Sequence, residues 1–127
     1  GNPLAMSVGY ETLRQLDSSL YDVLEEKASA LENGFRENLT ALGLGFPLNR
    51  VGSMMTLFFT DRLVNNYESA NSCDQKLFAR YFRSMLDHGI YLAPSQFEAN
   101  FISLSHNDSD IQLTVNAHLE SLKECLE

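Results

Sequence analysis

Hydrophobic residues recur every three or four positions over three long stretches of the sequence, and this spacing predicts amphipathic helices. The clearest stretch runs from Leu20 to Leu42, and a second runs from Leu77 to Leu86. A third opens at Asn107 or Asp108 and continues to Leu126. The residues expected to face inward are Leu20, Val23, Leu24, Ala28, Leu31, Phe35, Leu39 and Leu42, then Leu77, Phe78, Tyr81, Phe82, Met85 and Leu86, and finally Ile111, Val115, Leu119, Leu122 and Leu126.

Polar residues and glycines mark where these helices begin and end. Ser19 with Asp22 three residues later has the form of a capping box, in which each side chain satisfies a free backbone donor. Asp74 is a second predicted N-cap. Gly43 and Gly89 are expected to end the first two helices, because glycine adopts the left-handed conformation that closes a helix.

Between the first two helices the period changes to that of strands. Phe46 to Arg50 is short and contains Pro47, so it predicts an edge strand. Val51 and Gly52 predict a tight turn. Met54 to Thr60 is rich in strand-forming residues and apolar on both faces, which predicts a strand that is covered on both sides.

Weaker patterns complete the order of elements. Pro3 to Leu16 predicts a helix at the N-terminus, residues 65–71 a short helix, and Phe101 to Leu104 a further strand. The resulting order, ααββααβα, predicts an α+β fold with a small antiparallel sheet flanked by helices. The length of 127 residues is that of one small domain.

Composition narrows the classes of function. The net charge is −8, so no cluster of Lys and Arg could neutralise successive phosphates, and we expect no binding to nucleic acid or to an anionic membrane. No apolar run reaches the roughly 20 residues that cross a bilayer, and no signal peptide opens the chain, which predicts a cytoplasmic protein. Cys73 and Cys125 are expected to be unpaired thiols, and the three histidines show no metal-ligand spacing, so no metal site is predicted.

Spacing alone reveals no catalytic constellation. The three lysines, Lys27, Lys76 and Lys123, fall on or near polar helical faces, which argues against a desolvated Schiff-base lysine. One segment, residues 91–101, places Ser95, Gln96 and Glu98 among aromatic and apolar residues in a predicted loop. These polar groups either satisfy one another structurally or bind a ligand, and the sequence leaves both readings open.

Several motifs together resemble a known family. They are Gly1 to Met6, Arg50 to Met54, Thr56 to Asp61 and Tyr91 to Ala99. In order and spacing they are similar to the C-terminal region of the glutamate-1-semialdehyde 2,1-aminomutase family, which are class III aminotransferases of fold type I. The resemblance covers nearly the whole chain. It implies a cytoplasmic homodimer that uses pyridoxal 5'-phosphate (PLP) to isomerise glutamate-1-semialdehyde to 5-aminolevulinate in tetrapyrrole biosynthesis.

The resemblance also implies site residues and domains. Glu98 matches the family's active-site glutamate near the cofactor and the substrate amines, with Ser95 and Gln96 as supporting residues. The Schiff-base lysine and the cofactor-binding residues would lie upstream of Gly1, so the chain is expected to be an inactive C-terminal fragment that binds no PLP by itself. Residues 1–16 would form a helix linking to the large domain, and residues 17–127 the α+β core of the small domain.

Two consequences follow for partners. The fragment is expected to self-associate through surface that the large domain normally covers. The alternative hypothesis is a free-standing, non-catalytic α+β module for interaction or dimerisation that has an aminotransferase-like fold.

Overall fold

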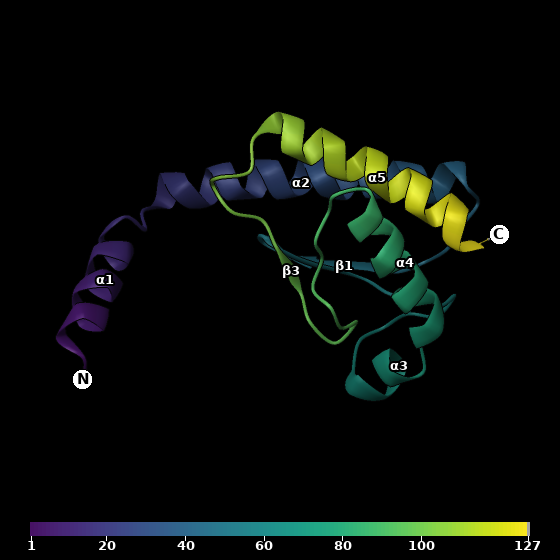
Figure 1. The fold of residues 1–127 in the computed structure, drawn as a ribbon, viewed down its shortest axis with the longest axis horizontal. Coiled ribbons are helices and arrows are strands. Elements are labelled where there is room, and N and C mark those ends of the chain that lie inside the picture. The colour runs from purple at the N-terminus through teal and green to yellow at the C-terminus, as the bar shows by residue number, and fades with distance from the viewer. Residues whose placement is uncertain (127) are drawn as a thin grey trace.

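A computed structural model describes residues 1–126, and Figure 1 shows the arrangement of the elements within them. The helices are α1 (Pro3–Arg14), α2 (Ser18–Ala41), α3 (Tyr67–Asn71), α4 (Gln75–Asp87) and α5 (Asp108–Leu126), and the strands are β1 (Leu48–Val51), β2 (Met54–Leu57) and β3 (Asn100–Phe101). The order of elements and the α+β class predicted from the sequence are confirmed.

The three strands form one antiparallel sheet in the order β1-β2-β3, so β1 lies at an edge as predicted, although Pro47 falls just before the strand. Leu48 pairs with Leu57 at one end of the hairpin, and Val51 pairs with Met54 beside the turn. Gly52 has φ +55° in that turn, a conformation that a residue with a side chain rarely adopts. The strands are shorter than predicted and shifted, because Val51 belongs to β1 rather than to the turn.

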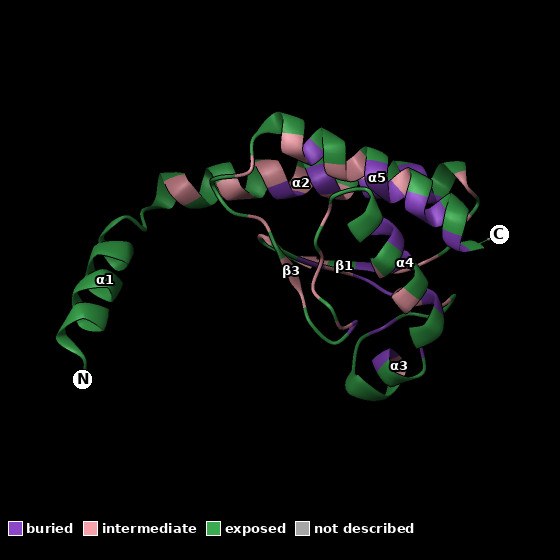
Figure 2. Cartoon of the chain, viewed as in Figure 1, coloured by how far each residue is buried: buried purple, intermediate pink, exposed green. Residues whose placement is uncertain are grey.

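One face of the sheet carries the core. Met55 and Leu57 of β2 and Leu48 of β1 are buried against α2, α4 and α5, which lie on this face in Figure 1. Figure 2 shows the buried stretches of α2, α4 and α5 turned toward one another. The buried members of this core are Leu31, Phe35, Leu39, Leu48, Met55, Leu57, Phe59, Leu77, Tyr81, Met85, Ile111, Ala117, Leu122 and Cys125.

The opposite face of the sheet is open, which corrects the prediction that the second strand is covered on both sides. Val51, Met54 and Phe101 lie in one row across the three strands and are 73%, 39% and 64% exposed. The expected strand also ends early. Beyond Leu57 the Phe58 amide still donates to the Pro47 carbonyl at 2.9 Å, and the Phe58 side chain packs into a separate small cluster with Val64, Ala70 and Cys73.

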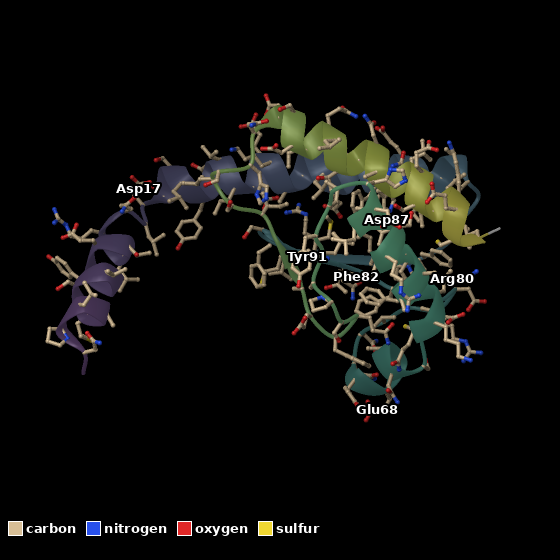
Figure 3. All side chains as sticks on the ribbon, in the orientation of Figure 1. Asp17, Glu68, Arg80, Phe82, Asp87 and Tyr91 are labelled. Carbon is tan, nitrogen blue, oxygen red and sulfur yellow. The ribbon has the colours of Figure 1, made fainter. Side chains whose placement is uncertain are left out.

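The helix ends follow the sequence closely, with one exception. Asp74 caps α4 through its carboxylate, and Gly43 and Gly89 adopt positive φ just past α2 and α4 as predicted. The predicted capping box at Ser19 is wrong. Asp17, labelled between α1 and α2 in Figure 3, caps α2 by accepting a hydrogen bond from the Leu20 amide at 3.0 Å.

The inward faces differ from the prediction at three apolar positions. Val23, Leu86 and Leu126 are 40%, 47% and 43% exposed. Ser84 and Ser121 are buried instead and hydrogen-bond to each other at 2.9 Å between α4 and α5. The buried face of a helix includes any small polar residue that finds a partner there, and hydrophobicity alone cannot identify such residues.

Helix α1 projects away from the rest of the chain in Figure 1. It contains no buried residue, and Asn2 caps it through its side chain. Its apolar residues are exposed: Leu4, Met6, Val8, Tyr10 and Leu13.

Arg50 ties the inner face of β1 to α2. Its guanidinium reaches Glu32 at 2.5 Å and Glu25 at 2.7 Å, and the Arg50 and Glu32 side chains are only 16% and 17% exposed. These carboxylates, Glu25 first, raise the pKa of Arg50 further above its usual range. The ion pairs hold the sheet in a fixed position relative to α2.

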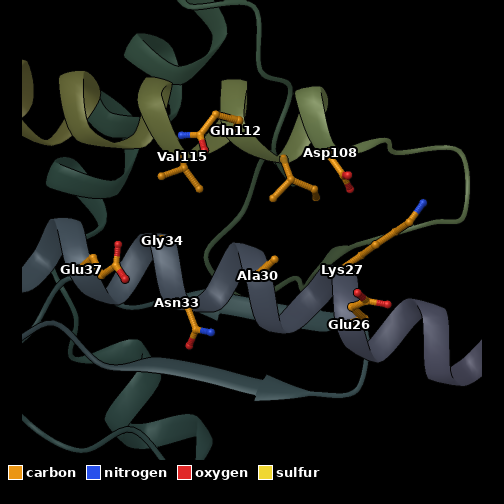
Figure 4. A pocket seen from close by; sticks show the side chains of 10 residues that line it. Glu26, Lys27, Ala30, Asn33, Gly34, Glu37, Asp108, Gln112 and Val115 are labelled. Atoms are coloured by element: carbon orange, nitrogen blue, oxygen red, sulfur yellow. The ribbon is translucent and has the colours of Figure 1, made fainter.

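Gly34 of α2 lies close to Val115 of α5, and the two residues face each other in Figure 4. A Cβ on Gly34 would lie 2.4 Å from Val115 Cγ2 and 3.2 Å from its Cβ, so the helices would have to separate. We expect Gly34→Ala to lower the free energy of unfolding by about 2 kcal/mol, because overpacking outweighs the better helix propensity of alanine. Urea denaturation measures this.

Gly9 provides the matched control, since a Cβ there would meet nothing within 4 Å. Gly9→Ala should leave the unfolding transition unchanged, and Val115→Ala should restore part of the stability lost in Gly34→Ala. An undiminished stability of Gly34→Ala would show that the two helices do not pack as described.

Candidate functional site

The polar trio of the sequence lies in the connection between α4 and β3. A tight turn spans Ser95 to Glu98, with the Glu98 amide donating to the Ser95 carbonyl at 3.0 Å. The Ser95 hydroxyl accepts a second hydrogen bond, from the Phe97 amide, at 3.2 Å. Ser95 therefore has a structural role within the turn.

Strand β2 holds one side of this turn. The Thr56 hydroxyl donates to the Glu98 carbonyl at 3.2 Å. Asn100 accepts from the Ala93 amide at 2.7 Å and donates to the Met55 carbonyl at 3.4 Å. The backbone at Glu98 is thus fixed to the sheet.

Gln96 holds the other side. Its side chain is 3% exposed and donates from Nε2 to the carbonyl of Ala70 in α3 at 3.1 Å. Its Oε1 is buried and has no hydrogen-bond partner among the described residues. Buried polar atoms nearly always have a hydrogen-bond partner, so the unpaired Oε1 of Gln96 is an exception.

Glu98 differs from both neighbours because its side chain is exposed. No hydrogen bond or ion pair from residues 1–126 reaches its carboxylate, whereas its backbone is held on both sides. A charged acceptor on a fixed backbone, with no protein partner of its own, is suited to bind a donor that arrives from outside.

A groove of about 430 Å³ lies beside this turn. Gln96, Phe97 and Glu98 form one wall, and α3 forms another through Tyr67, whose ring centroid lies 5.8 Å from that of Phe97. The remaining lining residues are Asn49, Thr56, Phe58, Val64, Asn65, Asn66, Ala70 and Ala99. The groove thus joins the turn, α3 and the open face of the sheet.

The groove offers acceptors and no cation. None of its lining residues is Lys or Arg, and the exposed Glu98 carboxylate is the charged acceptor among them. Such a lining favours donors such as amines and repels a second carboxylate.

The lysines lie elsewhere. Lys27 donates from Nζ to the carbonyls of Leu104 and His106, where it closes the connection before α5. Lys123 pairs with Glu120 at 2.8 Å. The lining residues therefore offer PLP neither an amine for a Schiff base nor a cation for its phosphate. On this observation, these residues fit amine groups of a substrate and do not by themselves hold the cofactor.

The cysteines and His118 lie in the packed interior of the chain. Cys73 and Cys125 are free and buried, as expected, and burial raises the pKa of both thiols. No three His, Cys, Asp or Glu side chains gather in residues 1–126 in a way that could hold a metal ion. His118 is fully buried in the core, where burial lowers its pKa to about 3.

A second groove, of about 450 Å³, lies between α2 and α5 and is the one drawn in Figure 4. It is lined by acidic and amide side chains that include Glu26, Glu37, Asp108 and Gln112. None of the polar trio of the sequence reaches it. No described helix is long and apolar enough to cross a membrane.

Sequence reasoning found the turn but missed the walls of its groove. Asn49, Thr56 and Tyr67 join the site only because the hairpin and α3 come to lie beside the turn. No spacing rule relates these positions, which are separated from Glu98 by between 31 and 49 residues in the chain.

Comparisons with known proteins show strong sequence similarity to one group of enzymes. The chain is 56% identical over 124 residues to the glutamate-1-semialdehyde 2,1-aminomutase of Chlorobium phaeovibrioides, which covers 97% of the chain and 29% of that protein. It is 54% identical over 123 residues to the protein of the same name from Pelodictyon phaeoclathratiforme, covering 96% of the chain and 28% of the relative. The chain thus spans less than a third of the length of these relatives. No family model matches it.

Solved structures share the fold. An omega-transaminase from Sphaerobacter thermophilus matches with a TM-score of 0.85 at 19% identity, covering all of the chain and 29% of that protein. A glutamate-1-semialdehyde-aminomutase from Pseudomonas aeruginosa matches with a TM-score of 0.76 at 21% identity, covering 86% of the chain and 24% of that protein. A variant of the latter was solved in complex with PMP. The matched parts are C-terminal, which confirms the expected region of the fold.

Proposed function

Because this chain is homologous to the C-terminal region of glutamate-1-semialdehyde 2,1-aminomutases, we propose that the protein it forms part of isomerises glutamate-1-semialdehyde to 5-aminolevulinate with PLP. The observation that carries the proposal is the identity of 56% over nearly the whole chain. The free carboxylate of Glu98 at a groove that no Lys or Arg lines supports it, because the reaction moves an amino group.

Within this proposal Glu98 faces the amines of the substrate. Its carboxylate accepts hydrogen bonds only, so it binds and orients an ammonium group and disfavours a substrate held with its own carboxylate at that place. Thr56 and Gln96 fix the backbone of the turn, and Ser95 closes the turn itself. PLP, when bound, supplies the electron sink of the reaction, held by residues outside the groove described above.

The domain and partner assignments belong to the same proposal. Residues 1–16 would link the α+β core of residues 17–127 to a large domain, and the whole enzyme would be a cytoplasmic homodimer. The exposed apolar residues of α1 support the link, since such a helix face is normally covered. The free thiols Cys73 and Cys125 support the reducing compartment.

A chimeric enzyme tests the function. The C-terminal segment that matches this chain in the Chlorobium phaeovibrioides aminomutase would be replaced by this chain, and the formation of 5-aminolevulinate would be measured. We expect turnover within about tenfold of the parent enzyme, because the exchanged segment should place Glu98 as the parent's own segment does. A misplacement of about 1 Å would cost up to about a hundredfold. The parent protein, expressed and assayed in parallel, is the control.

A chimera that folds and binds PLP but forms no 5-aminolevulinate would overturn the proposal. That result would favour the alternative, a non-catalytic module for interaction or dimerisation. The specific observation behind this alternative is the fully exposed helix α1, whose apolar side chains could bind a partner. Self-association of the isolated chain does not separate the two hypotheses, because the enzyme fragment is expected to self-associate as well, so the activity of the chimera decides between them.

A further inference from the structure

We propose that Gln96 is a positioning residue that acts on Glu98 by anchoring the turn between them to helix α3. The inference rests on the proposed function, since it concerns the same site. The side-chain amide of Gln96 is not needed to close the turn, which the Glu98 amide and the Ser95 carbonyl close between them.

The anchor is built from three fixed parts. Gln96 occupies the first central position of the turn that the Ser95 carbonyl and the Glu98 amide close. Its Nε2 donates to the Ala70 carbonyl, which lies in the last turn of α3 and also accepts from the Cys73 amide at 3.2 Å. The turn that ends at Glu98 therefore cannot move without breaking a buried hydrogen bond to a helix.

Helix α3 is itself held in place, so it can serve as an anchor. Asn66 and Ser69 form a reciprocal capping box at its start. Ala70 is buried in the small cluster with Phe58 and Cys73, and the Asp74 amide that follows donates to the Phe59 carbonyl at 3.0 Å. Motion of the turn is thus opposed by the strand segment that leads out of β2 as well as by α3.

Glu98 lies between two anchors. The Thr56 hydroxyl of β2 binds its carbonyl from one side, and Gln96 holds the preceding backbone to α3 on the other. With both in place, the exposed carboxylate projects from a backbone of defined position. Loss of either would widen the range of positions that the carboxylate samples, and an ion pair with a substrate amine depends steeply on position.

The chemistry of the amide argues against a purely structural role. Gln96 Oε1 is buried without a partner, which costs stability, and a methionine of similar length would fill the same space without that cost. The hydrogen bond from Nε2 and the unpaired Oε1 act in opposite directions on stability. Gln96 therefore contributes little net stability, and its donor group serves to hold the turn.

The test uses the chimeric enzyme and the substitution Gln96→Met. We expect kcat to fall by about tenfold or more, with little change in the melting temperature, because the donor is lost together with the unpaired acceptor. The matched control is Gln112→Met on the exposed face of α5, which should leave kcat unchanged. A second variant, Gln96→Glu, keeps the length of the side chain, and because burial favours the neutral carboxyl group, its O–H can donate to the Ala70 carbonyl. It should therefore retain more of the kcat than Gln96→Met.

A double variant distinguishes positioning from structure. If Gln96 acts through Glu98, Gln96→Met should cause no further loss of kcat in a Glu98→Gln background. Additive losses would overturn the inference, and so would a Gln96→Met enzyme whose melting temperature falls while its kcat stays the same. Full activity of Glu98→Gln would instead contradict the role proposed for Glu98, so the two failures are distinguishable.

Discussion

Lowering the pH from about 7.5 to about 4.5 is expected to reduce the free energy of unfolding of this chain by about 2.7 kcal/mol through His118 alone. The side chain of His118 has no exposed surface and stacks on Phe35 with a centroid distance of 3.7 Å. Burial lowers its pKa to about 3 in the folded chain, whereas an unfolded histidine has a pKa of about 6.5.

The sign follows from these two pKa values. Below about pH 6.5 the unfolded chain binds a proton at His118 that the folded chain rejects until about pH 3. Acid therefore favours unfolding throughout that window, by about 1.4 kcal/mol for each pH unit, and above the window His118 contributes nothing to the pH dependence.

The surroundings of His118 contain no compensating charge. Its Nδ1 lies 3.1 Å from Asn38 Nδ2, Tyr81 packs against its edge, and its Nε2 has no partner among the described residues. Carboxylates such as Glu25, whose pKa the hydrogen bond from Arg50 lowers, begin to lose their stabilising contribution only as the pH falls toward their ordinary pKa of 4.5. The loss of stability between about pH 6.5 and about pH 5 is therefore due mainly to His118.

Urea denaturation at several pH values measures the effect. His118→Gln should flatten the dependence of stability on pH between about 6.5 and 4.5, since the replacement does not titrate. The matched control His88→Gln, at the exposed end of α4, should retain the steep loss in acid. A stability of the unmodified chain that stays level across this window would contradict the burial described here.

Glu98→Gln is expected to lower kcat of the chimeric enzyme by about a hundredfold. The change removes the negative charge and replaces one acceptor oxygen by a donor, so it weakens the binding of amines while it preserves shape. Since the Glu98 side chain is exposed and no described residue pairs with it, the melting temperature should not change. Steady-state kinetics and thermal unfolding provide the two readings.

Glu37→Gln serves as the control, because it makes the same change at an exposed position of α2 outside the Glu98 groove. It should leave kcat unchanged. If Glu98→Gln and Glu37→Gln were equally active, Glu98 would have no part in the reaction. If Glu98→Gln lost both activity and melting temperature, its role would be structural.

Helical periodicity predicted most of the fold because long helices bury whole faces. The α2 and α4 stretches, the Asp74 cap and the glycine closures all agree with the structure. The strands were predicted less well. Met54 to Thr60 was predicted as one strand, but β2 ends at Leu57, and Phe58 is buried in the small cluster around α3. Apolar residues on both faces predicted that this segment is buried. The pattern cannot show whether the segment is one strand covered on both sides or a shorter strand followed by residues that pack into a second cluster.

The candidate site, too, was predicted only in part from the sequence. Polar residues among aromatic ones indicated the turn at Ser95, Gln96 and Glu98, and the family resemblance singled out Glu98. What the sequence could not show is which of them is paired. Gln96 proves to be a buried anchor with one free acceptor, and Glu98 the exposed group, because tertiary contacts with α3 and β2 decide their surroundings.

The central claim is that this chain contributes the Glu98 carboxylate to an aminomutase site. The most direct measurement is the crystal structure of the chimeric enzyme with a bound diamine that resembles the substrate. We expect a distance of about 4 Å or less between a carboxylate oxygen of Glu98 and a nitrogen of the diamine, the range of an ion pair. A well-ordered diamine more than about 10 Å from Glu98, where charges are largely screened, would contradict the claim.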